Sequence, residues 1–326
     1  MKKLDADNIG VRFIFDFRNP VIFTHGDTDG MTAAALLIRE FKKNNVKPVL
    51  YITQPFSLHS DLKHAMKELL LSNLIFVDLA LTDKSVAMLP AGSVVIDHHP
   101  ATEERISELK KKNIHYFVDT KVSASMLCGT LVSESKFNKY LARLGGVGDW
   151  VIKDKRLGRQ AMMIAAAISW EPSDDTFRAY VVNELVREMK PGKMNGVKIR
   201  ADKAFKKLDK IKETGKVLYD GNKFIIKLYK NGFGRAAVLA SKLALSTKKV
   251  AIVLTLMKGN SKQYLMTGRS PGTKTKPLYN MRKFMSRFMA TDEGGGLAKA
   301  ASCVIEKKKL KDLVSFVEEV DKKAKK

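Results

Sequence analysis

Short apolar runs alternate with amphipathic segments along the first third of the chain, and this pattern most constrains its fold. The runs VIFTH, KPVLYI, LIFVDLA, SVVIDHH and IHYFVDT are rich in Val, Ile, Leu and Phe without strict alternation, as is typical of strands buried on both faces. The segments between them, from MTAAALLIREFKK to ATEERISELKKK, place apolar residues three and four positions apart. Alternating strands and helices predict an α/β fold with a doubly wound parallel sheet.

Acidic and histidine residues follow the predicted strands, at the end where open parallel sheets bind their ligands. GDTDG follows the first strand, one strand ends near an aspartate, another ends in DHH, and LGGVGDW supplies a further aspartate. Carboxylates and imidazoles together are ligands for Mn²⁺ and similar divalent cations. The candidate residues are His25, Asp27, Asp29, Asp78, Asp97, His98, His99 and Asp149.

Simpler interpretations exist for some of these residues. Asp27 or Asp29 could cap the following helix, and Asp78 could cap a helix that starts near Thr82. Capping needs only one carboxylate, whereas two carboxylates and an imidazole held close together repel or lose hydration unless a cation neutralises them. An aspartate in a Gly-rich turn, such as Asp149, is common. The DHH run is harder to explain without a bound partner, so we favour a metal site.

The second half of the chain predicts a further domain. Residues 123–190 are expected to be mainly helical, and the basic stretch 197–215 is expected to be a helical connector or part of a nucleic-acid track. From about residue 217, KFIIKLYK, KVAIVLTLM and QYLMTGRS predict strands, while GRAAVLASKLAL, PLYNMRKFMSRFMA and the lysine-rich tail predict helices. The triple glycine of EGGGLAKAASCVI is expected to open a small-residue helix. We expect domains at 1–190 and 217–326, joined by a helical linker at 191–216.

The chain is strongly basic, with 59 Lys and Arg against 34 Asp and Glu and a net charge of +25. High charge alone can serve solubility, but beside a candidate site for phosphate chemistry it favours nucleic acid as the partner. The sequence shows no amphipathic helix with aromatic anchors of the kind that binds a membrane surface. The apolar runs are too short for a membrane span. No apolar signal-peptide core follows MKKLDADNIG, and the two cysteines lie far apart. We therefore expect a cytoplasmic protein with no membrane partner.

The order of the motifs resembles a known family. HGDTDG, a strand-end aspartate, DHH, GDW, and then GGG followed by AKAAS are similar to the DHH phosphoesterase superfamily, and within it to the RecJ-like single-strand nucleases of the compact archaeal type. The resemblance extends over roughly residues 20–310. It implies a parallel-sheet phosphoesterase domain and a smaller α/β DHH-associated C-terminal domain, with the active cleft between them.

The resemblance also implies roles for individual residues. One ion would be held by His25, Asp27 and Asp78, and a second by Asp29, Asp78, His98 and Asp149. Asp97 would orient an imidazole and His99 would face the substrate phosphate, so Asp97, His98 and His99 form the catalytic motif. The expected substrate-binding residues are His99, Arg235, Arg269, Gly294, Gly295, Gly296 and Lys299. Leu297 stands where the family commonly has a histidine, and Lys299 could supply replacement charge.

The function implied is that of a metal-dependent exonuclease, which hydrolyses phosphodiester bonds of single-stranded DNA or RNA with a water activated by two divalent ions. Two histidine ligands favour Mn²⁺ over Mg²⁺. Relatives act in DNA repair and replication, and archaeal ones can associate with the GINS replication complex. Two alternatives stay open: a phosphoesterase of short oligonucleotides or 3′-phosphoadenosine phosphate, and a non-catalytic replication scaffold. The second is disfavoured because every expected ligand is present. The direction of digestion, the choice of DNA or RNA, and the oligomeric state stay open as well.

Overall fold

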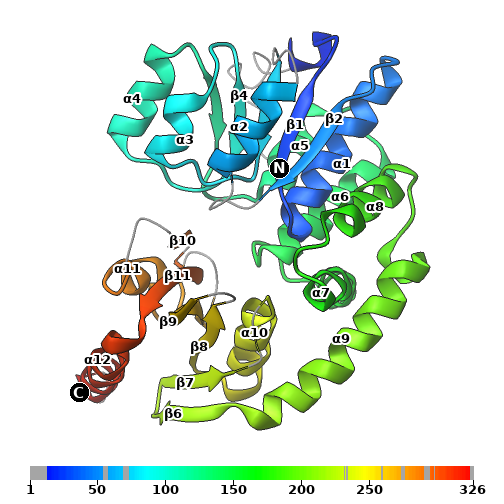
Figure 1. Cartoon of the computed structure of the whole chain (residues 1–326). Coiled ribbons are helices and arrows are strands. Elements are labelled where there is room, and N and C mark those ends of the chain that lie inside the picture. Colours follow the sequence, from blue (N-terminus) through cyan, green and yellow to red (C-terminus); the bar gives the residue numbers. More distant parts are fainter. Residues whose placement is uncertain are drawn as a thin grey trace. The chain divides into compact units, whose positions relative to one another are not determined.

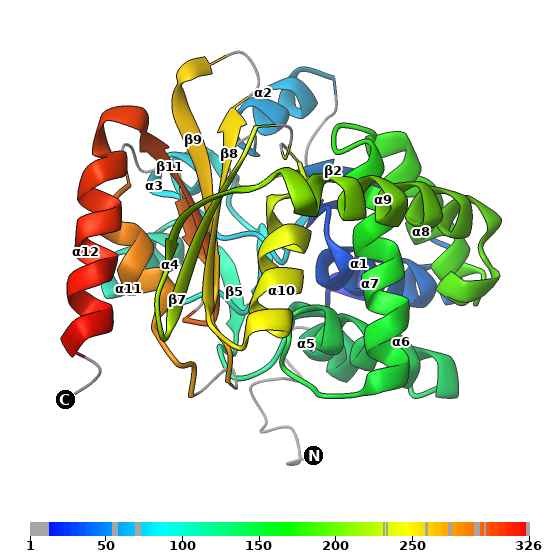
Figure 2. The same ribbon diagram turned by 90° about the horizontal axis from the view of Figure 1, so that it is seen from below.

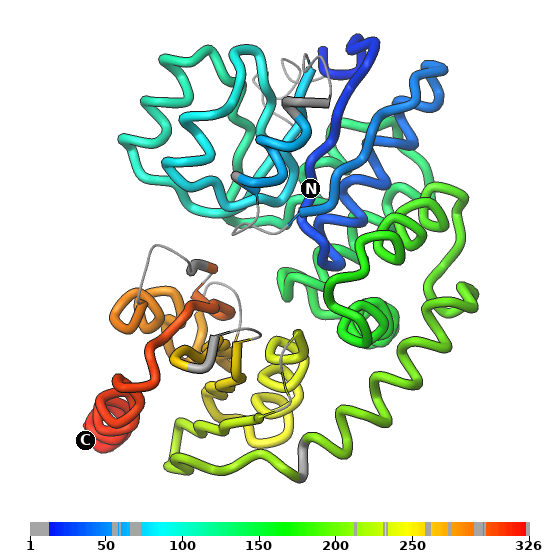
Figure 3. The backbone as a smooth tube through the Cα atoms, viewed as in Figure 1, coloured from blue at the N-terminus to red at the C-terminus, as the bar shows by residue number. Residues whose placement is uncertain are grey.

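The computed structural model describes residues 13–53, 58–68, 73–230, 232, 234–257, 260–272, 276–289, 294–296 and 298–323. The chain forms two compact units (Figures 1 and 3). The N-terminal unit runs to Ile168 and includes Ser173–Lys198, and the C-terminal unit comprises Ser169–Pro172 and the chain from Ile199 onward. Helix α9, Asn195–Thr214, contains the later of these transitions. The domain boundaries expected from the sequence stay a prediction, as does a cleft between the domains.

The N-terminal unit is built on a five-stranded sheet in which all neighbouring strands are parallel. The strand order is β2-β1-β3-β4-β5, which is one of the two common doubly wound orders. The α/β fold and the parallel sheet expected from the sequence are therefore confirmed. The strands are β1 Val21–His25, β2 Val49–Thr53, β3 Leu74–Val77, β4 Val94–Asp97 and β5 His115–Val118.

Helices cover both faces of this sheet, and the alternation of strand side chains explains how. Phe23, Phe76 and Val95 pack in one core cluster with residues of α2, α3 and α4. Their neighbours Ile22 and Ile75 point to the opposite face, where they are fully buried and where α1 and α5 contact the strands. The helices are α1 Thr28–Lys43, α2 Leu58–Glu68, α3 Asp83–Met88, α4 Glu103–Lys111 and α5 Ala124–Leu131.

The sheet contains a topological switch point between β1 and β3. The chain leaves β1 toward β2 on one side, and β3 pairs with β1 on the other side. Thr24 pairs with Val77, so the residues that follow β1 and β3 emerge side by side. Switch points of this kind are where open α/β sheets bind ligands. The N-terminal unit then continues through α6 Lys136–Gly148, α7 Lys155–Trp170 and α8 Asp175–Val186.

The C-terminal unit has a six-stranded sheet in the order β10-β11-β9-β8-β7-β6. Only β7 and β8 are parallel; the other neighbours are antiparallel. Helix α10 lies on one face, and α11 and α12 pack on the other (Figure 2). The elements are β6 Lys216–Asp220, β7 Phe224–Tyr229, α10 Ala236–Thr247, β8 Val250–Met257, β9 Asn260–Arg269, α11 Met281–Ser286, β10 Gly294–Gly296, β11 Ala300–Glu306 and α12 Leu310–Lys323. In the described part of the chain, no helix is both long and apolar enough to cross a membrane.

One sequence-based expectation for this unit is wrong. The triple glycine does not open a helix; it forms strand β10, and the small residues after it form strand β11. Ala301, Cys303 and Ile305 alternate toward the apolar core, so burial with a period of two overrides the helix propensity of the alanines. Leu297, where the family histidine was expected, lies outside the described residues. Strand β6 was not anticipated.

Candidate metal centre

The end of β1 and the turn that follows it carry the first two candidate ligands. Asp27 is the N-cap of α1, and its Oδ1 accepts a hydrogen bond from Gly30 N at 3.0 Å. Its other oxygen, Oδ2, lies 3.1 Å from His25 Nδ1. Capping therefore accounts for only one of the two oxygens. Gly30 is required in this turn because a Cβ added there would lie 2.3 Å from His25 O.

Asp29, in the first turn of α1, is held by the start of another helix. Its Oδ2 accepts a hydrogen bond from Ala124 N at 2.8 Å, and its Oδ1 accepts one from Ser125 N at 3.1 Å. These amides begin α5, where the helix dipole favours a carboxylate. Gly145 of α6 packs against the same group, since a Cβ added there would lie 2.5 Å from Asp29 Oδ1. We did not predict this support, although Ser123, which caps α5, and the paired glycines in α6 were visible signals.

Asp78 follows β3 with a left-handed backbone, φ 58°. Its amide donates to Ile96 O at 3.0 Å, which ties it to β4. The simpler interpretation of Asp78 as a helix cap is wrong, because Thr82 caps α3 and forms a capping box with Ser85. Non-glycine residues in this region of backbone space cluster at functional sites.

The carboxylate of Asp78 lies between two histidines. Its Oδ1 is 3.1 Å from His98 Nε2, and its Oδ2 is 3.7 Å from His25 Nδ1. Oδ2 is buried and accepts no hydrogen bond among the described residues. An acceptor of this kind is costly to bury, and a cation shared with neighbouring ligands would satisfy it.

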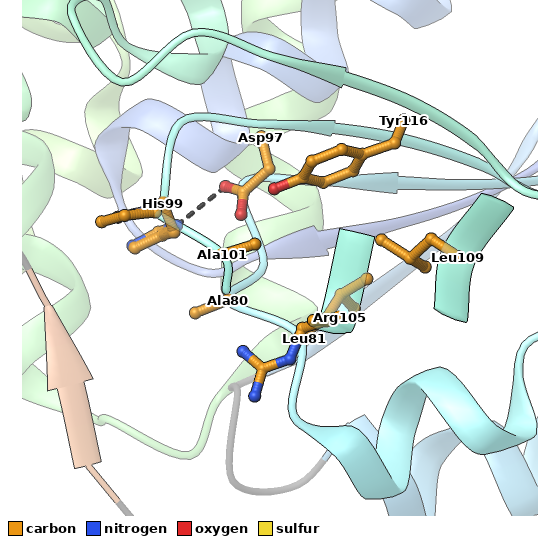
Figure 4. A pocket seen from close by; sticks show the side chains of 9 residues that line it. Ala80, Leu81, Asp97, His99, Ala101, Arg105, Leu109 and Tyr116 are labelled. Carbon is orange, nitrogen blue, oxygen red and sulfur yellow. Dashed lines mark hydrogen bonds and ion pairs between the residues drawn. The ribbon is translucent and has the colours of Figure 1, made fainter. Parts of the chain in front are cut away.

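The DHH run begins at Asp97, the last residue of β4, and the carboxylate of Asp97 holds the two residues that follow it. Asp97 Oδ1 accepts a hydrogen bond from His98 N at 2.8 Å. It accepts a second one from His99 Nδ1, also at 2.8 Å (Figure 4). His98 is 1% exposed, and its Nδ1 lies 3.6 Å from Asp149 Oδ2. His98 thus points into the cluster, while Asp97 fixes the ring of His99.

Asp149 reaches the cluster because α6 ends at it. The amide of Val151 donates to Gly146 O at 2.8 Å, and that of Trp150 donates to Val147 O at 3.1 Å, which is the bonding of a Schellman motif. Glycine usually occupies the left-handed position of this motif, but here it is Trp150, with φ 62°. The helix therefore stops abruptly beside His98.

The structure brings these ligand atoms into three groups, within each of which the atoms lie no more than 4.8 Å apart. The first group matches the residues expected around one ion, and the second contains three of the four expected around the other. Asp78 joins the first and third groups, and His98 joins the second and third. The groups are His25, Asp27 and Asp78; Asp29, His98 and Asp149; and Asp78, Asp97, His98 and His99.

Burial and neighbouring charges shift the pKa values of the ionisable groups in this cluster. Burial raises the pKa of Asp29 to about 7, and the negative charge of Asp78 adds to the shift. Burial alone would lower the pKa of His98, but the hydrogen bond to Asp78 and the charges of Asp149 and Asp78 outweigh it and raise that pKa to about 10. Crowded carboxylates that shift in this way would be relieved by a divalent cation. The donor set, carboxylate and imidazole, fits Mn²⁺ or Mg²⁺ better than a soft metal.

A small cavity of ≈ 30 Å³ lies beside Asp97 and His99. Its walls include Tyr116 of β5 and Arg105 of α4, and the hydroxyl of Tyr116 points toward the Asp97 carboxylate (Figure 4). Burial, followed by the charge of Asp97, raises the pKa of Tyr116 to about 12. A cavity of this size holds one or two waters and is too small for a nucleotide.

The candidate substrate-binding residues of the C-terminal unit do not form one cluster. Arg269 ends β9 and pairs with Ala300, next to Lys299 and close to the register of Gly296. Arg235 comes from the opposite end of the sheet, because it follows β7, which runs parallel to β8. It is 8% exposed, and its Nη2 donates to Trp170 O at 2.9 Å. Gly294 and Gly295 precede Gly296 in strand β10. The roles assigned to all of these residues stay predictions.

Comparison with known proteins agrees with this geometry. Residues 19–144 match the family model described as DHH family, N-terminal domain. This part of the chain belongs to the DHH family. The matched residues include the switch point and the candidate ligands that lie at the ends of β1, β3 and β4. Asp149 lies just beyond the matched residues. No curated protein matches the sequence.

Solved structures show that the similarity in fold extends over both units. A DHH domain described as a member of the s1p family of ribosomal proteins has 14% identity and a TM-score of 0.65, covering 96% of this chain and 89% of that one. RecJ in complex with Mn²⁺ from Thermus thermophilus has 12% identity and a TM-score of 0.61, covering 98% and 55%. Exonuclease RecJ bound to manganese has 13% identity and a TM-score of 0.52, covering 98% and 94%. At these identities the likeness shows a shared fold.

Proposed function

We propose that this protein is a RecJ-like, metal-dependent exonuclease, which hydrolyses phosphodiester bonds of single-stranded nucleic acid. The observation that carries the proposal is the convergence of three groups of ligand atoms at the switch point of a DHH-family domain. Groups that share Asp78 and His98 suit two ions held close together. Such pairs of ions are typical of phosphodiester hydrolysis.

The proximity of the ligand atoms supports an assignment of residues to the two proposed ions. His25, Asp27 and Asp78 would hold one ion, and Asp29, His98 and Asp149 the other, with Asp78 contributing to both. When bound, divalent ions would supply Lewis acidity, lowering the pKa of water and neutralising charge on the phosphate. The RecJ structures of similar fold, which carry manganese by their descriptions, support Mn²⁺ as the ion to test first.

In this proposal, His99 contacts the substrate phosphate. Its Nδ1 donates to Asp97, which leaves Nε2 on the far side of the ring. Burial alone would lower the pKa of His99, but the charge and hydrogen bond of Asp97 outweigh it and raise that pKa. A raised pKa favours the imidazolium form, which donates a charge-assisted hydrogen bond to a phosphate oxygen. Asp97 thus acts on the substrate through His99.

The preference for a polymeric substrate is supported by charge. A net charge of +25 favours binding of a polyanion along many phosphates, and such binding weakens steeply with salt. A mononucleotide needs only a few local contacts. Arg269, Gly296 and Lys299, gathered at one end of the C-terminal sheet, are the substrate contacts that we would test first.

The direct test is a time course on 5′- and 3′-labelled DNA and RNA single strands of several lengths, with Mn²⁺ and with chelator. We expect stepwise shortening that requires the metal and is abolished by Asp29→Ala, while Asp312→Ala, on the exposed surface of α12, behaves as wild type. Faster turnover of dinucleotides than of long strands would instead indicate a phosphoesterase of short oligonucleotides. A folded protein with neither hydrolysis nor Mn²⁺ binding would indicate a scaffold.

A further inference from the structure

Arg178 of α8 is a buried arginine directly behind the turn that carries His25 and Asp27. Its side chain is 5% exposed, which is rare for arginine unless it has specific partners. Its Nε donates to Gly26 O at 3.0 Å, and its Nη1 donates to Asp175 Oδ1 at 2.9 Å. No sequence motif pointed to this residue, which lies 152 positions from Gly26 in the chain.

The carbonyl that Arg178 holds belongs to the one residue between two candidate ligands. Gly26 is buried, so its carbonyl requires a donor from within the protein. Its peptide group connects His25, the last residue of β1, to Asp27, the N-cap of α1. A rotation of this peptide would turn the two ligand side chains relative to each other.

Other contacts hold the two ends of this turn, and Arg178 holds the Gly26 carbonyl in its middle. Gly30 N bonds to Asp27 Oδ1, and Thr24 Oγ1 donates to Gly30 O at 2.8 Å. The first bond caps the N-terminus of α1, and the second joins β1 to α1. The guanidinium comes from a distant helix and fixes the turn from outside, and its planar fork sets direction as well as distance.

We propose that Arg178 is a positioning residue of the metal centre, which fixes the Gly26 carbonyl and thereby the relative placement of His25 and Asp27. This inference rests on the proposed metal site and concerns only the ion held by His25, Asp27 and Asp78. Asp29 is held by the amides that begin α5, and Asp149 ends α6. His98 follows β4, so none of these three ligands depends on the turn at Gly26, and the second ion should be insensitive to Arg178.

The alternative is that Arg178 simply ties α8 to the sheet. A purely structural tie would lower the thermal stability without singling out one ion. Residues that orient metal ligands typically contribute about 10- to 100-fold to metal affinity. Removal of Arg178 would therefore weaken the binding of one of the two ions.

The test uses the full chain with Mn²⁺ alone, measured by calorimetry and by electron paramagnetic resonance, which distinguishes a coupled pair of ions from a single one. We expect Arg178→Met to weaken one binding event about 10- to 100-fold and to lose the coupled signal, with the other event unchanged. Arg178→Lys, which keeps the charge but replaces the planar fork of two donor nitrogens with a single ammonium, should fall between. Arg187→Met is the matched control, since Arg187 follows the same helix and is 74% exposed.

A folded Arg178→Met protein that binds both ions as wild type does would overturn the inference, and so would equal weakening of both events. If that variant does not fold, the lysine variant decides: wild-type affinity for both ions refutes the inference, and selective weakening of one supports it. Absence of Mn²⁺ binding by the wild-type protein would instead refute the metal centre itself, which is a separate result.

Discussion

Asp97 holds the imidazole of His99 through a 2.8 Å hydrogen bond between Oδ1 and Nδ1. The same oxygen accepts the amide of His98, so one carboxylate fixes both the backbone of the DHH turn and the ring beside it. Burial would raise the pKa of Asp97, but the charge and hydrogen bond of His99 outweigh it and lower that pKa.

Replacing Asp97 by asparagine should lower the pKa of His99 toward its ordinary value, because the charge that favours the imidazolium is lost. The pair stabilises the fold most where Asp97 is ionised and His99 protonated even in the unfolded chain, from about pH 4 to about pH 6.5. Its contribution fades below that window as Asp97 takes up a proton, and above it as His99 loses one. A titration followed by NMR of the His99 ring measures the shift, with Asp119→Asn as the control. Identical titration curves for His99 in the wild type and in Asp97→Asn would contradict the prediction. We also expect the turnover of the Asp97→Asn variant to fall about 10- to 100-fold.

Binding of Mn²⁺ should release protons. In the metal-free protein the pKa of His98 is about 10 and that of Asp29 about 7, so His98 is protonated at pH 8, whereas a metal ligand must be deprotonated. The apparent affinity should therefore rise with pH up to about 10, by up to about tenfold per pH unit for one released proton. Calorimetry in buffers of different ionisation enthalpy counts the protons. His64→Asn, an exposed change on α2, should leave the count unchanged, and a binding heat that does not depend on the buffer at pH 8 would rule out the release.

Substitution of Gly145 by alanine should damage the metal centre and the fold together. The added Cβ would lie 2.1 Å from Ser125 Oγ and 2.3 Å from Thr32 Oγ1, so α6 must move away from the segment that holds Asp29. Overpacking of this kind costs about 1–3 kcal/mol of unfolding free energy, and we expect weaker Mn²⁺ binding as well. Gly192→Ala is the control, since nothing lies within 4 Å of the Cβ it would add. Chemical denaturation compares the two, and equal stabilities would show that the close approach is not needed.

Asp321 should stabilise the packing of the C-terminal helix α12 against the sheet, although it lies far in sequence from every candidate ligand. Its Oδ2 accepts hydrogen bonds from Tyr219 Oη at 2.8 Å and Asn222 N at 2.7 Å, and its Oδ1 accepts one from Lys223 N at 2.9 Å. Asp321→Ala leaves these donors without their acceptor, at a cost of about 1–3 kcal/mol for a buried group. Thermal unfolding measures the loss, and Glu319→Ala, which removes an exposed ion pair on the same helix, should change stability by less than about 1 kcal/mol. Mn²⁺ affinity should be the same in both variants, and a smaller loss for Asp321 than for Glu319 would contradict the assignment.

The sheet and the ligand cluster were predictable because both depend on short, local sequence patterns. Continuous apolar runs identify buried parallel strands, and such strands present their following residues at one edge. Asp29, Asp78 and His98 could therefore be placed near one another from the positions at which their strands end or their helix begins.

The supports of the cluster could not be predicted in the same way. The amides of Ala124 and Ser125 that hold Asp29, and the guanidinium of Arg178 behind Gly26, act across about 90 to 150 residues and have no spacing that marks them. The segment after Gly296 shows a second limit, because its alanines favour a helix locally while pairing with β9 makes it a strand. Tertiary pairing overrides propensity in such segments.

The left-handed backbone at Asp78 restricts which residue types this position can accept. Glycine and asparagine tolerate that bend at little cost, whereas longer or branched side chains would distort it. Either tolerated replacement would keep the path of the chain but remove the negative charge shared by the two histidines. A protein with either replacement would therefore keep this framework and lose the charge on which the proposed metal centre depends.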